Sequence, residues 1–255
     1  MARAAGIAPQ AAARDAKGAL QRMARPTGDF DAGRYFRGDH GLGFYNVGTG
    51  PMRALARSIH AAHRDDWTIG DAMAFADALM ADRHLEVKSV GIEVVARYRR
   101  AFTPALLPRW KRWLARNQSA NWATTDSMCG SLIGPLLVQY PALVERMRAW
   151  SRDRNMWVRR ASMVSLIRPL QLLEDGRALD LAYEIARRLH ADDHDLIQKA
   201  VGWVLREAGK EDAARLERYL RAHGPAIPRT TLRYAIERFP AAKRRTLLKV
   251  TRHGR

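Results

Sequence analysis

The sequence predicts an all-α fold of stacked helical repeats, because four of its segments resemble one another at similar spacing. Three clear copies begin at His84, Asn155 and His194, and a weaker copy begins at Asn121, so the gaps are 37, 34 and 39 residues. This spacing is close to the period of paired-helix repeats of the HEAT and armadillo type. The sequence also lacks the sustained period-two alternation that strands would show. We therefore expect a curved HEAT-like solenoid, whose concave side is an extended binding surface.

The charge balance indicates what that surface binds. The 255 residues include 44 Lys and Arg against 26 Asp and Glu, a formal net charge of +18. Such an excess destabilises a compact chain through self-repulsion and is typical of proteins that bind polyanions. Nucleic acid is the leading candidate, because each phosphate that a cation neutralises releases condensed counterions. An arginine-rich coding bias contributes to the excess but does not require so few acidic residues. We expect the concave face to be basic and to bind nucleic acid.

The N-terminal residues divide into an arm and a first helix. Residues 1–13 are rich in Ala and Arg and poor in acidic residues, and we expect them to be a disordered arm. Residues 15–25 are expected to form the first helix, because Ala16, Leu20 and Met23 are spaced to face one side.

A glycine-rich connection follows over residues 28–50, around a short helical segment near residues 31–37. Pro51 favours the first turn of a helix that extends to about residue 63, because the N–H that proline lacks would be unpaired there in any case.

The later helices are predicted from apolar positions at helical spacing and from residues that favour helix ends. Starts are marked by Thr68, Pro104, Pro141 and Pro228, and stops by Gly209 and Gly224. The predicted helices cover residues 71–80, 87–101, 104–116, 125–139, 142–151, 158–166, 176–189, 196–208, 213–222 and 228–239. We expect residues 14–240 to form a single HEAT-like repeat domain and residues 241–255 to form a mobile basic tail.

Several classes of protein are disfavoured by what the sequence lacks. Cys129 is the single cysteine, which excludes a disulfide framework and a cysteine zinc site. No apolar run approaches the roughly 18 residues of a membrane span. No secretory leader pattern is visible, so we expect a cytoplasmic protein. The His190–His194 segment contains metal-ligand residue types, but exposed histidines at a helix end explain it better, and we expect no cofactor.

The repeat predicts a column of polar residues. The sixth positions of the four copies are Ser89, Asp126, Arg160 and Lys199, and Arg159 adjoins the third. Because equivalent helices of a repeat protein stack side by side, these residues would lie on one face.

Two tryptophans accompany this column. Lys199, Trp203 and Arg206 are spaced i, i+4, i+7 and so share one face of a helix, apart from most of its aliphatic residues. Trp122 and Asp126 have the same i, i+4 spacing. The sequence therefore predicts a cleft that contains two indoles, one carboxylate and several cations.

A carboxylate on a surface that holds DNA repels phosphate, so it favours a chemical role. Hydrolysis of an N-glycosidic bond builds positive charge on the sugar, and glycosidases place a carboxylate beside such charge. Indole faces attract cationic groups by about 0.5–2 kcal/mol, and an alkylated purine is cationic. Taken singly, each residue has a simpler explanation: the tryptophans as core, Asp126 as a partner of the helix dipole, and the cations as solvated. Taken as one column, they favour function.

Several segments resemble the DNA alkylation repair family of HEAT-like-repeat DNA glycosylases. They are Asn121-Trp-Ala-Thr-Thr-Asp126, Trp157-Val-Arg-Arg-Ala161 and Ile197-Gln-Lys-Ala-Val-Gly-Trp-Val-Leu-Arg-Glu207, with a weaker match at Arg34-Tyr-Phe36 and Pro51-Met-Arg53. The resemblance spans roughly residues 15–240. It implies excision of N3- and N7-alkylated purines from duplex DNA without extrusion of the base into a pocket, which most base-modifying enzymes require.

The resemblance also implies residue roles. Asp126 would be the catalytic carboxylate, with Trp122 and Trp203 packed against the deoxyribose and backbone of the lesion. Tyr35 would be a further aromatic wall, and Arg160 and Arg206 would hold phosphates. From the column itself, we also expect Arg159 and Lys199 to bind DNA. No cofactor is implied, and we expect the protein to act as a monomer.

The sequence departs from the family pattern at two residues close to Asp126. Ala123 stands where an acidic residue is common, and Thr125 stands where an apolar residue is usual. Two other classes stay open: a non-catalytic helical-repeat protein that binds damaged or branched DNA, and a protein–protein scaffold with a mixed or apolar concave face.

Overall fold

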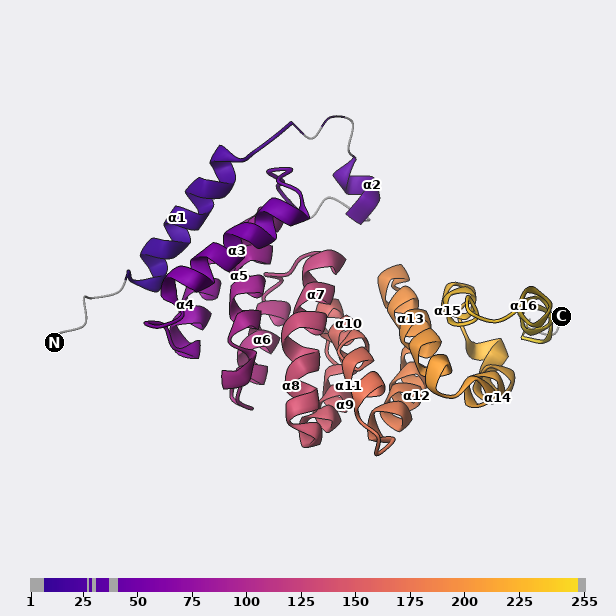
Figure 1. Cartoon of the computed structure of the whole chain (residues 1–255). Coiled ribbons are helices and arrows are strands. Elements are labelled where there is room, and N and C mark those ends of the chain that lie inside the picture. The colour runs from indigo at the N-terminus through magenta and orange to yellow at the C-terminus, as the bar shows by residue number, and fades with distance from the viewer. Residues whose placement is uncertain (1–6, 27, 29–30, 37–40, 252–255) are drawn as a thin grey trace. The chain divides into compact units, whose positions relative to one another are not determined.

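The computed structural model describes residues 7–26, 28, 31–36 and 41–251, and these are mainly helices joined by short turns (Figure 1). No strand is found in these ranges; an isolated parallel bridge joins Gly43 to His84. The prediction of an all-α, helical-repeat fold is confirmed. The chain folds as two compact units, Met1–Leu132 and Ile133–Arg255, so the expected single domain over residues 14–240 contains the boundary between them.

The first unit is organised around one central helix. Its helices are α1 (Pro9–Arg22), α2 (Ala32–Phe36), α3 (Thr49–His63), α4 (Ile69–Met80), α5 (Leu85–Arg97), α6 (Leu106–Ala115) and α7 (Trp122–Met128), with a 3₁₀ turn at Arg99–Ala101. Helix α5 packs against α1, α3, α4 and α7. Its Val90 and Val94 are fully buried in the same cluster as Leu20, Phe75 and Leu79.

The second unit is organised in the same way around α13. Its helices are α8 (Gly134–Gln139), α9 (Arg146–Trp150), α10 (Met156–Val164), α11 (Ile167–Leu172), α12 (Arg177–Leu189), α13 (Asp195–Glu211), α14 (Ala213–His223), α15 (Arg229–Ala235) and α16 (Ala241–Val250), with 3₁₀ turns at Pro141–Glu145 and Gly224–Ala226. Helix α13 packs against α10, α11, α12, α14 and α15. A π-helical turn, Cys129–Ile133, interrupts the helix expected over residues 125–139.

The four repeat starts are the N-cap residues of four helices, α5, α7, α10 and α13. Asn121 accepts a hydrogen bond from the backbone N–H of Thr124, and Asn155 accepts from Trp157. The ring of His194 accepts from Leu196. His84 makes no such bond and instead contacts Asp82. Side-chain acceptors at this position satisfy N–H groups that the helix leaves unpaired, which explains why asparagine and histidine recur there.

The expectation of a disordered arm over residues 1–13 is wrong for its second half. Helix α1 begins at Pro9, and Ala12 and Ala13 are buried where α1 packs against α4 and α5. Proline at the first helical position is favourable for the reason given for Pro51. The packing of small alanine side chains against neighbouring helices stabilises this turn, and residues 1–6 lie outside the described part of the chain.

The expectation of a mobile basic tail over residues 241–255 is also wrong up to residue 250. Helix α16 buries Leu247 completely, and the Lys243 ammonium lies 2.6 Å from the Glu217 carboxylate. The Arg229 guanidinium donates to the carbonyl of Leu248 over 3.1 Å. A single buried leucine and these polar contacts therefore hold the helix against the second unit.

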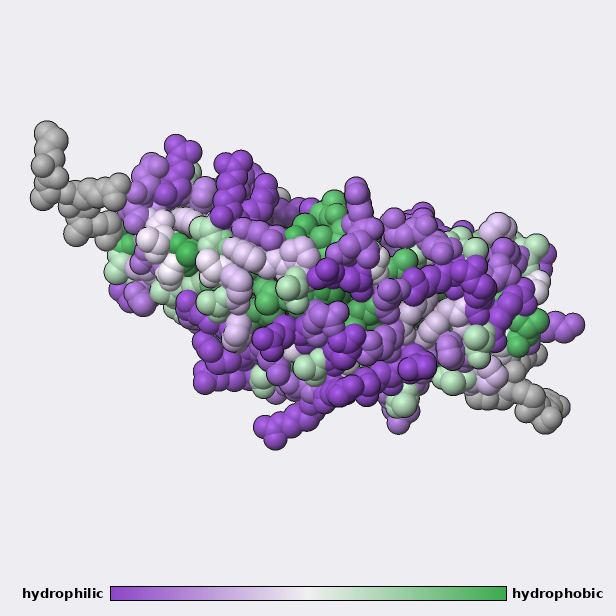
Figure 2. All heavy atoms as spheres, turned by 90° about the horizontal axis from the view of Figure 1, so that it is seen from below, coloured by the Kyte–Doolittle hydropathy of each residue, from purple (hydrophilic) through white to green (hydrophobic). Residues whose placement is uncertain are grey.

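The side of the molecule shown in Figure 2 is mostly hydrophilic, and hydrophobic residues appear there in small separate groups. Among the described residues, the large hydrophobic side chains with more than a third of their surface exposed are Ile7, Tyr35, Leu172, Tyr234 and Val250, from different parts of the chain. Single exposed apolar residues are ordinary on monomeric proteins.

Gly202→Ala is expected to destabilise the second unit. A Cβ at this position would lie 2.5 Å from Cβ of Tyr234 and 2.6 Å from the carbonyl oxygen of Thr231, so α15 would have to move away from α13. Overpacking of this kind costs about 1–3 kcal/mol. The matched control is Gly130→Ala, because a Cβ there meets nothing within 4 Å. Thermal unfolding should show a lower Tm for Gly202→Ala alone; equal Tm values would contradict the close approach.

Asn121→Ala is expected to cost more stability than Asn155→Ala. Loss of an N-cap acceptor costs about 1 kcal/mol in either variant. Asn121 is fully buried, and its amide also donates to the Ser119 carbonyl at 2.7 Å and to the Thr124 hydroxyl at 2.9 Å. Its removal leaves those buried groups unpaired, which adds a further penalty of about 1–3 kcal/mol. Urea unfolding monitored by circular dichroism measures both variants, and a larger loss for Asn155→Ala would refute this account.

Candidate functional site

The orientation of α7 is set by a turn with a polar interior. Asn117 and Ala120 have positive φ angles of 56° and 52°, which reverse the chain just before the helix. The buried Lys88 donates from its ammonium group to the carbonyl of Gln118 inside this turn. Burial lowers the pKa of Lys88, an effect that Asp82 opposes. Together with the Asn121 cap, these contacts fix the first turn of α7 on α5.

Trp122 lies among aromatic side chains from the preceding loop and helix. Its ring centroid is 5.4 Å from that of Tyr35 and 5.6 Å from that of Phe36, and its indole N–H donates to the Tyr35 carbonyl over 3.5 Å. Phe36 stacks in turn on Phe44 at 5.5 Å. The structure therefore brings together Tyr35 and Trp122, two residues that the sequence assigned to the same cleft.

A cavity of about 430 Å³ adjoins these aromatic residues. Phe36, Phe44, Met52 and Ser89 are among the residues that line it. The Glu86 carboxylate, also in the lining, accepts hydrogen bonds from the backbone N–H groups of the loop before α3. The cavity thus belongs to the first unit, and Ser89, the first residue of the predicted polar column, lines it.

Asp126 lies one helical turn after Trp122 and is partly buried. The neighbouring Thr125 is fully buried, and its hydroxyl has no hydrogen-bond partner among the described residues. Thr125, which differs from the family pattern, therefore faces the interior of the protein. The i, i+4 spacing places the Asp126 carboxylate and the Trp122 indole on one face of α7.

Arg159 and Arg160 are bound to the protein itself. The Arg159 Nε donates to the Asp192 carboxylate at 2.7 Å, and its Nη1 donates to the carbonyls of Asp153 and Arg154. Arg160 is only 5% exposed and donates to the carbonyl of Leu196, in the first turn of α13. Both guanidinium groups therefore join α10 to α13 or its preceding loop, and their assignment as phosphate contacts stays a prediction.

The exposed face of α13 contains Lys199, Trp203 and Arg206, all partly buried, at the expected spacing. Lys199 lies 2.6 Å from the Asp195 carboxylate, and Arg206 is paired with Glu237 and lies 3.8 Å from the buried Glu207. The side chains of Asp195 and Glu237 are about half exposed, 45% and 57%. Water weakens an ion pair whose carboxylate it reaches, so another anion can compete with Asp195 and Glu237 for these cations.

The structure thus forms two clusters of the predicted site residues. One consists of Tyr35, Trp122 and Asp126 in the first unit. The other consists of Arg159, Arg160, Lys199, Trp203 and Arg206 in the second. That the two clusters belong to one column of residues stays a prediction.

Sequence reasoning missed Phe36 and Phe44 as parts of the site. Phe36 is 2% exposed and lies between Trp122 and Phe44. A signal was present, because Phe36 directly follows Tyr35 and Phe44 follows Gly43 within the glycine-rich connection. Aromatic residues in such a connection need a surface to pack on, and the sequence alone did not reveal that Trp122 provides it.

The histidines of the His190–His194 segment have structural partners. His190 shares a hydrogen bond of 2.6 Å with the Tyr219 hydroxyl, and burial, with a contribution from His223, lowers its pKa to about 4. His194 caps α13. Among the described residues, no group of three His, Cys, Asp or Glu side chains is placed to hold a metal ion. None of the described helices is long and apolar enough to cross a membrane.

The solved structures include one with a similar fold. It is described as a predicted DNA alkylation repair enzyme from Enterococcus faecalis, and it superposes with a TM-score of 0.70 at 16% sequence identity. The alignment covers 82% of this chain and 93% of the other. At this identity the likeness shows the fold alone. No curated protein matches the sequence significantly.

The sequence itself matches a protein-family model over residues 16–239, which is most of its length. That model describes DNA alkylation repair enzymes. The match includes α7 and α13, which contribute the two clusters of site residues, and it ends just before α16. The chain belongs to the DNA alkylation repair enzyme family.

Proposed function

We propose that this protein is a DNA glycosylase that removes N3- and N7-alkylated purines from duplex DNA. The observation that carries the proposal is Asp126, a partly exposed residue one helical turn from a tryptophan that lies in an aromatic cluster. In a protein that only binds DNA, a carboxylate near the phosphates would weaken binding, because like charges repel each other. A family that repairs alkylated DNA supplies the chemistry for which such a carboxylate is useful.

The reaction is hydrolysis of the bond between the purine N9 and C1′ of the deoxyribose. Alkylation at N3 or N7 makes the purine cationic, so it departs as a neutral base with the electron pair of the broken bond. Positive charge then develops on the sugar, and the Asp126 carboxylate stabilises it, as carboxylates do in glycosidases. Water adds to C1′ and loses one proton, which leaves an abasic site and a free alkylpurine.

The aromatic residues are proposed to hold the lesion where it lies in the duplex. Trp122 and Trp203 are partly exposed, so each offers an indole surface to a deoxyribose or a cationic base. Tyr35, 54% exposed and packed on Trp122, extends the first of these surfaces. Contact with the sugar and the charged base in this way requires no extrusion of the base into a pocket, the step on which most base-modifying enzymes depend.

Lys199 and Arg206 are proposed as the main phosphate contacts. Their partners include two exposed carboxylates, Asp195 and Glu237, that a DNA phosphate can replace. Arg159 and Arg160, by contrast, support this surface from α10 through their bonds to Asp192 and Leu196. Duplex DNA is thus the proposed partner, with the protein acting as a monomer.

Asp126→Asn is expected to lose base release while DNA binding is kept. Removal of one group that stabilises transition-state charge costs about 10²–10³-fold in rate. The measurement is single-turnover release of N7-methylguanine from a duplex that contains one such lesion. Asp193→Asn, on the exposed turn before α13, is the matched control and should keep the full rate.

Release at the wild-type rate by Asp126→Asn would remove this carboxylate from the mechanism. Tight binding of the lesion duplex by wild type with no release of any alkylated base would instead favour a non-catalytic protein for damaged or branched DNA.

Lys199→Ala is expected to weaken duplex binding to a similar degree for all sequences. Loss of one phosphate contact should reduce the slope of log K against log salt by about 0.9. Fluorescence anisotropy at several salt concentrations measures that slope. Lys249→Ala, on the exposed side of α16, removes the same charge and should change the slope less. If the two variants give the same slope, Lys199 contributes only general charge.

A further inference from the structure

A second cavity of the first unit lies where the C-terminal ends of α3 and α5 meet. Its volume is about 380 Å³, and its lining consists of His60, Glu93, Ala96, Arg97, Arg99 and Arg100. His60 comes from α3, the next three residues from α5, and the last two from the 3₁₀ turn Arg99–Ala101. Three guanidinium groups from consecutive turns of the chain therefore surround one space.

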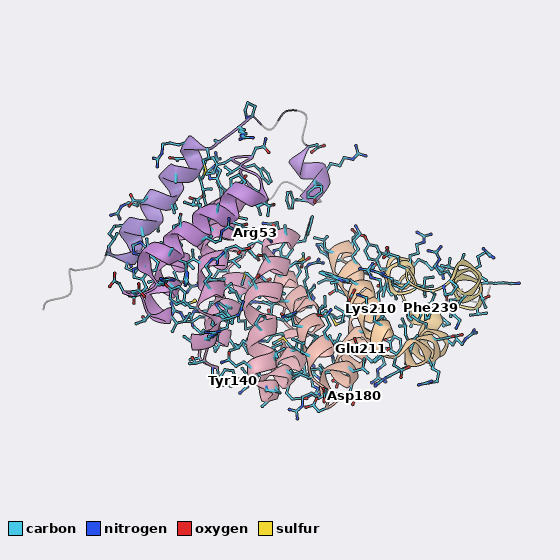
Figure 3. All side chains as sticks on the ribbon, in the orientation of Figure 1. Arg53, Tyr140, Asp180, Lys210, Glu211 and Phe239 are labelled. Atoms are coloured by element: carbon cyan, nitrogen blue, oxygen red, sulfur yellow. The ribbon has the colours of Figure 1, made fainter. Side chains whose placement is uncertain are left out.

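The positive charge of this cavity is not neutralised by neighbouring acids. Glu93, the carboxylate among the lining residues, is paired at 3.1 Å with Arg53, which is labelled on α3 in Figure 3. Within the described ranges, Arg97, Arg99 and Arg100 take part in no ion pair. The Nε of Arg97 is buried and has no hydrogen-bond partner among the described residues. A buried donor without a partner costs about 1–3 kcal/mol, so it marks a place for an acceptor.

His60 also lies in the positive electrostatic field of the arginines. Its ring packs edge-on against Tyr98, with the centroids 5.0 Å apart. Burial lowers the pKa of His60, and the positive charges of Arg97 and Arg64 lower it further. A neutral imidazole retains one N–H donor. The cavity therefore presents both guanidinium and imidazole donors to one anion.

The cavity lies on the helix face that also presents Ser89. Glu93 and Ala96 follow Ser89 at i+4 and i+7, which places all three on one side of α5. Seven residues of helix rise about 10 Å. This distance corresponds to about three base-pair steps of 3.4 Å each along one DNA strand. A duplex seated near Ser89 would bring a backbone phosphate within reach of the cavity.

We propose that this cavity is a phosphate-binding pocket, in which Arg97, Arg99 and Arg100 hold one phosphate group. Arginine is suited to this task, because its planar fork of N–H donors matches two phosphate oxygens at once. The phosphate comes either from the backbone of a bound duplex, beyond the lesion site, or from a free phosphate-bearing molecule. The duplex source rests on the proposed DNA binding, whereas the pocket itself does not.

The test uses an Arg99→Ala/Arg100→Ala double variant of the full chain. Its matched control is Arg187→Ala/Arg188→Ala on α12, where two adjacent exposed arginines are removed with the same change of charge. The first measurement is the salt dependence of binding to an undamaged duplex. If the pocket holds a backbone phosphate, the slope of log K against log salt falls by about 0.9 in the double variant and by less in the control.

The second measurement is a titration with inorganic phosphate, followed through the NMR signals of the His60 ring and assigned with His60→Gln. The wild type and the control should shift, and the double variant should not. A shift of this kind with no slope change beyond the control identifies free phosphate as the ligand. If neither measurement separates the double variant from the control, the pocket is refuted.

Base release measured on the same variants keeps the two proposals apart. The control variant should release N7-methylguanine at the wild-type rate, because Arg187 and Arg188 belong neither to the proposed site nor to the pocket. A wild-type protein that releases no base but shows the expected slope or His60 shift would overturn the glycosylase proposal and leave the pocket in place.

Discussion

The buried cap at the start of α7 is the constraint on which the candidate site depends. Trp122 and Asp126 are both residues of this short helix. Three fully buried residues, Ser119, Asn121 and Thr124, set the orientation of its first turn. Because buried polar groups are costly unless they are paired, this arrangement permits one orientation of the first turn. Lys88 fixes the preceding turn from the side of α5. Buried contacts thus set the position of Asp126, while the residue itself is partly exposed.

The cationic side chains of the protein have two different roles. Some cations, such as Arg159 and Arg160, are bound by carbonyls and a largely buried carboxylate, and they join helices to one another. Others, such as Lys199, have an exposed acidic partner that an incoming phosphate can replace, and Arg206 has one exposed partner, Glu237, besides the buried Glu207. A high net charge alone does not distinguish these roles. The difference lies in how far each ion pair is removed from water, because burial strengthens a pair that solvent would otherwise weaken.

The repeat starts could be predicted because helix capping is local chemistry. His84, Asn121, Asn155 and His194 each begin a helix, and an acceptor side chain at that position is useful whatever surrounds it. The early start of α1 at Pro9 could not be predicted in the same way. An alanine-rich segment has little helical stability alone, and it is the burial of Ala12 and Ala13 by neighbouring helices that extends the helix. The same holds for α16, which depends on Leu247 and on partners 19 or more residues away.

The sequence by itself determined the all-α class, the four repeat starts, the excess of positive charge and the spacing of Trp122 with Asp126 and of Trp203 with Lys199 and Arg206. These properties are periodic or compositional, so neighbours along the chain are sufficient to define them. Only the tertiary structure decided that Tyr35 and Phe36 pack on Trp122, that Arg160 is buried against α13, and that three arginines surround a cavity beside His60. Such contacts join residues far apart in sequence, and they depend on how closely helices approach, which side-chain volume and burial set together.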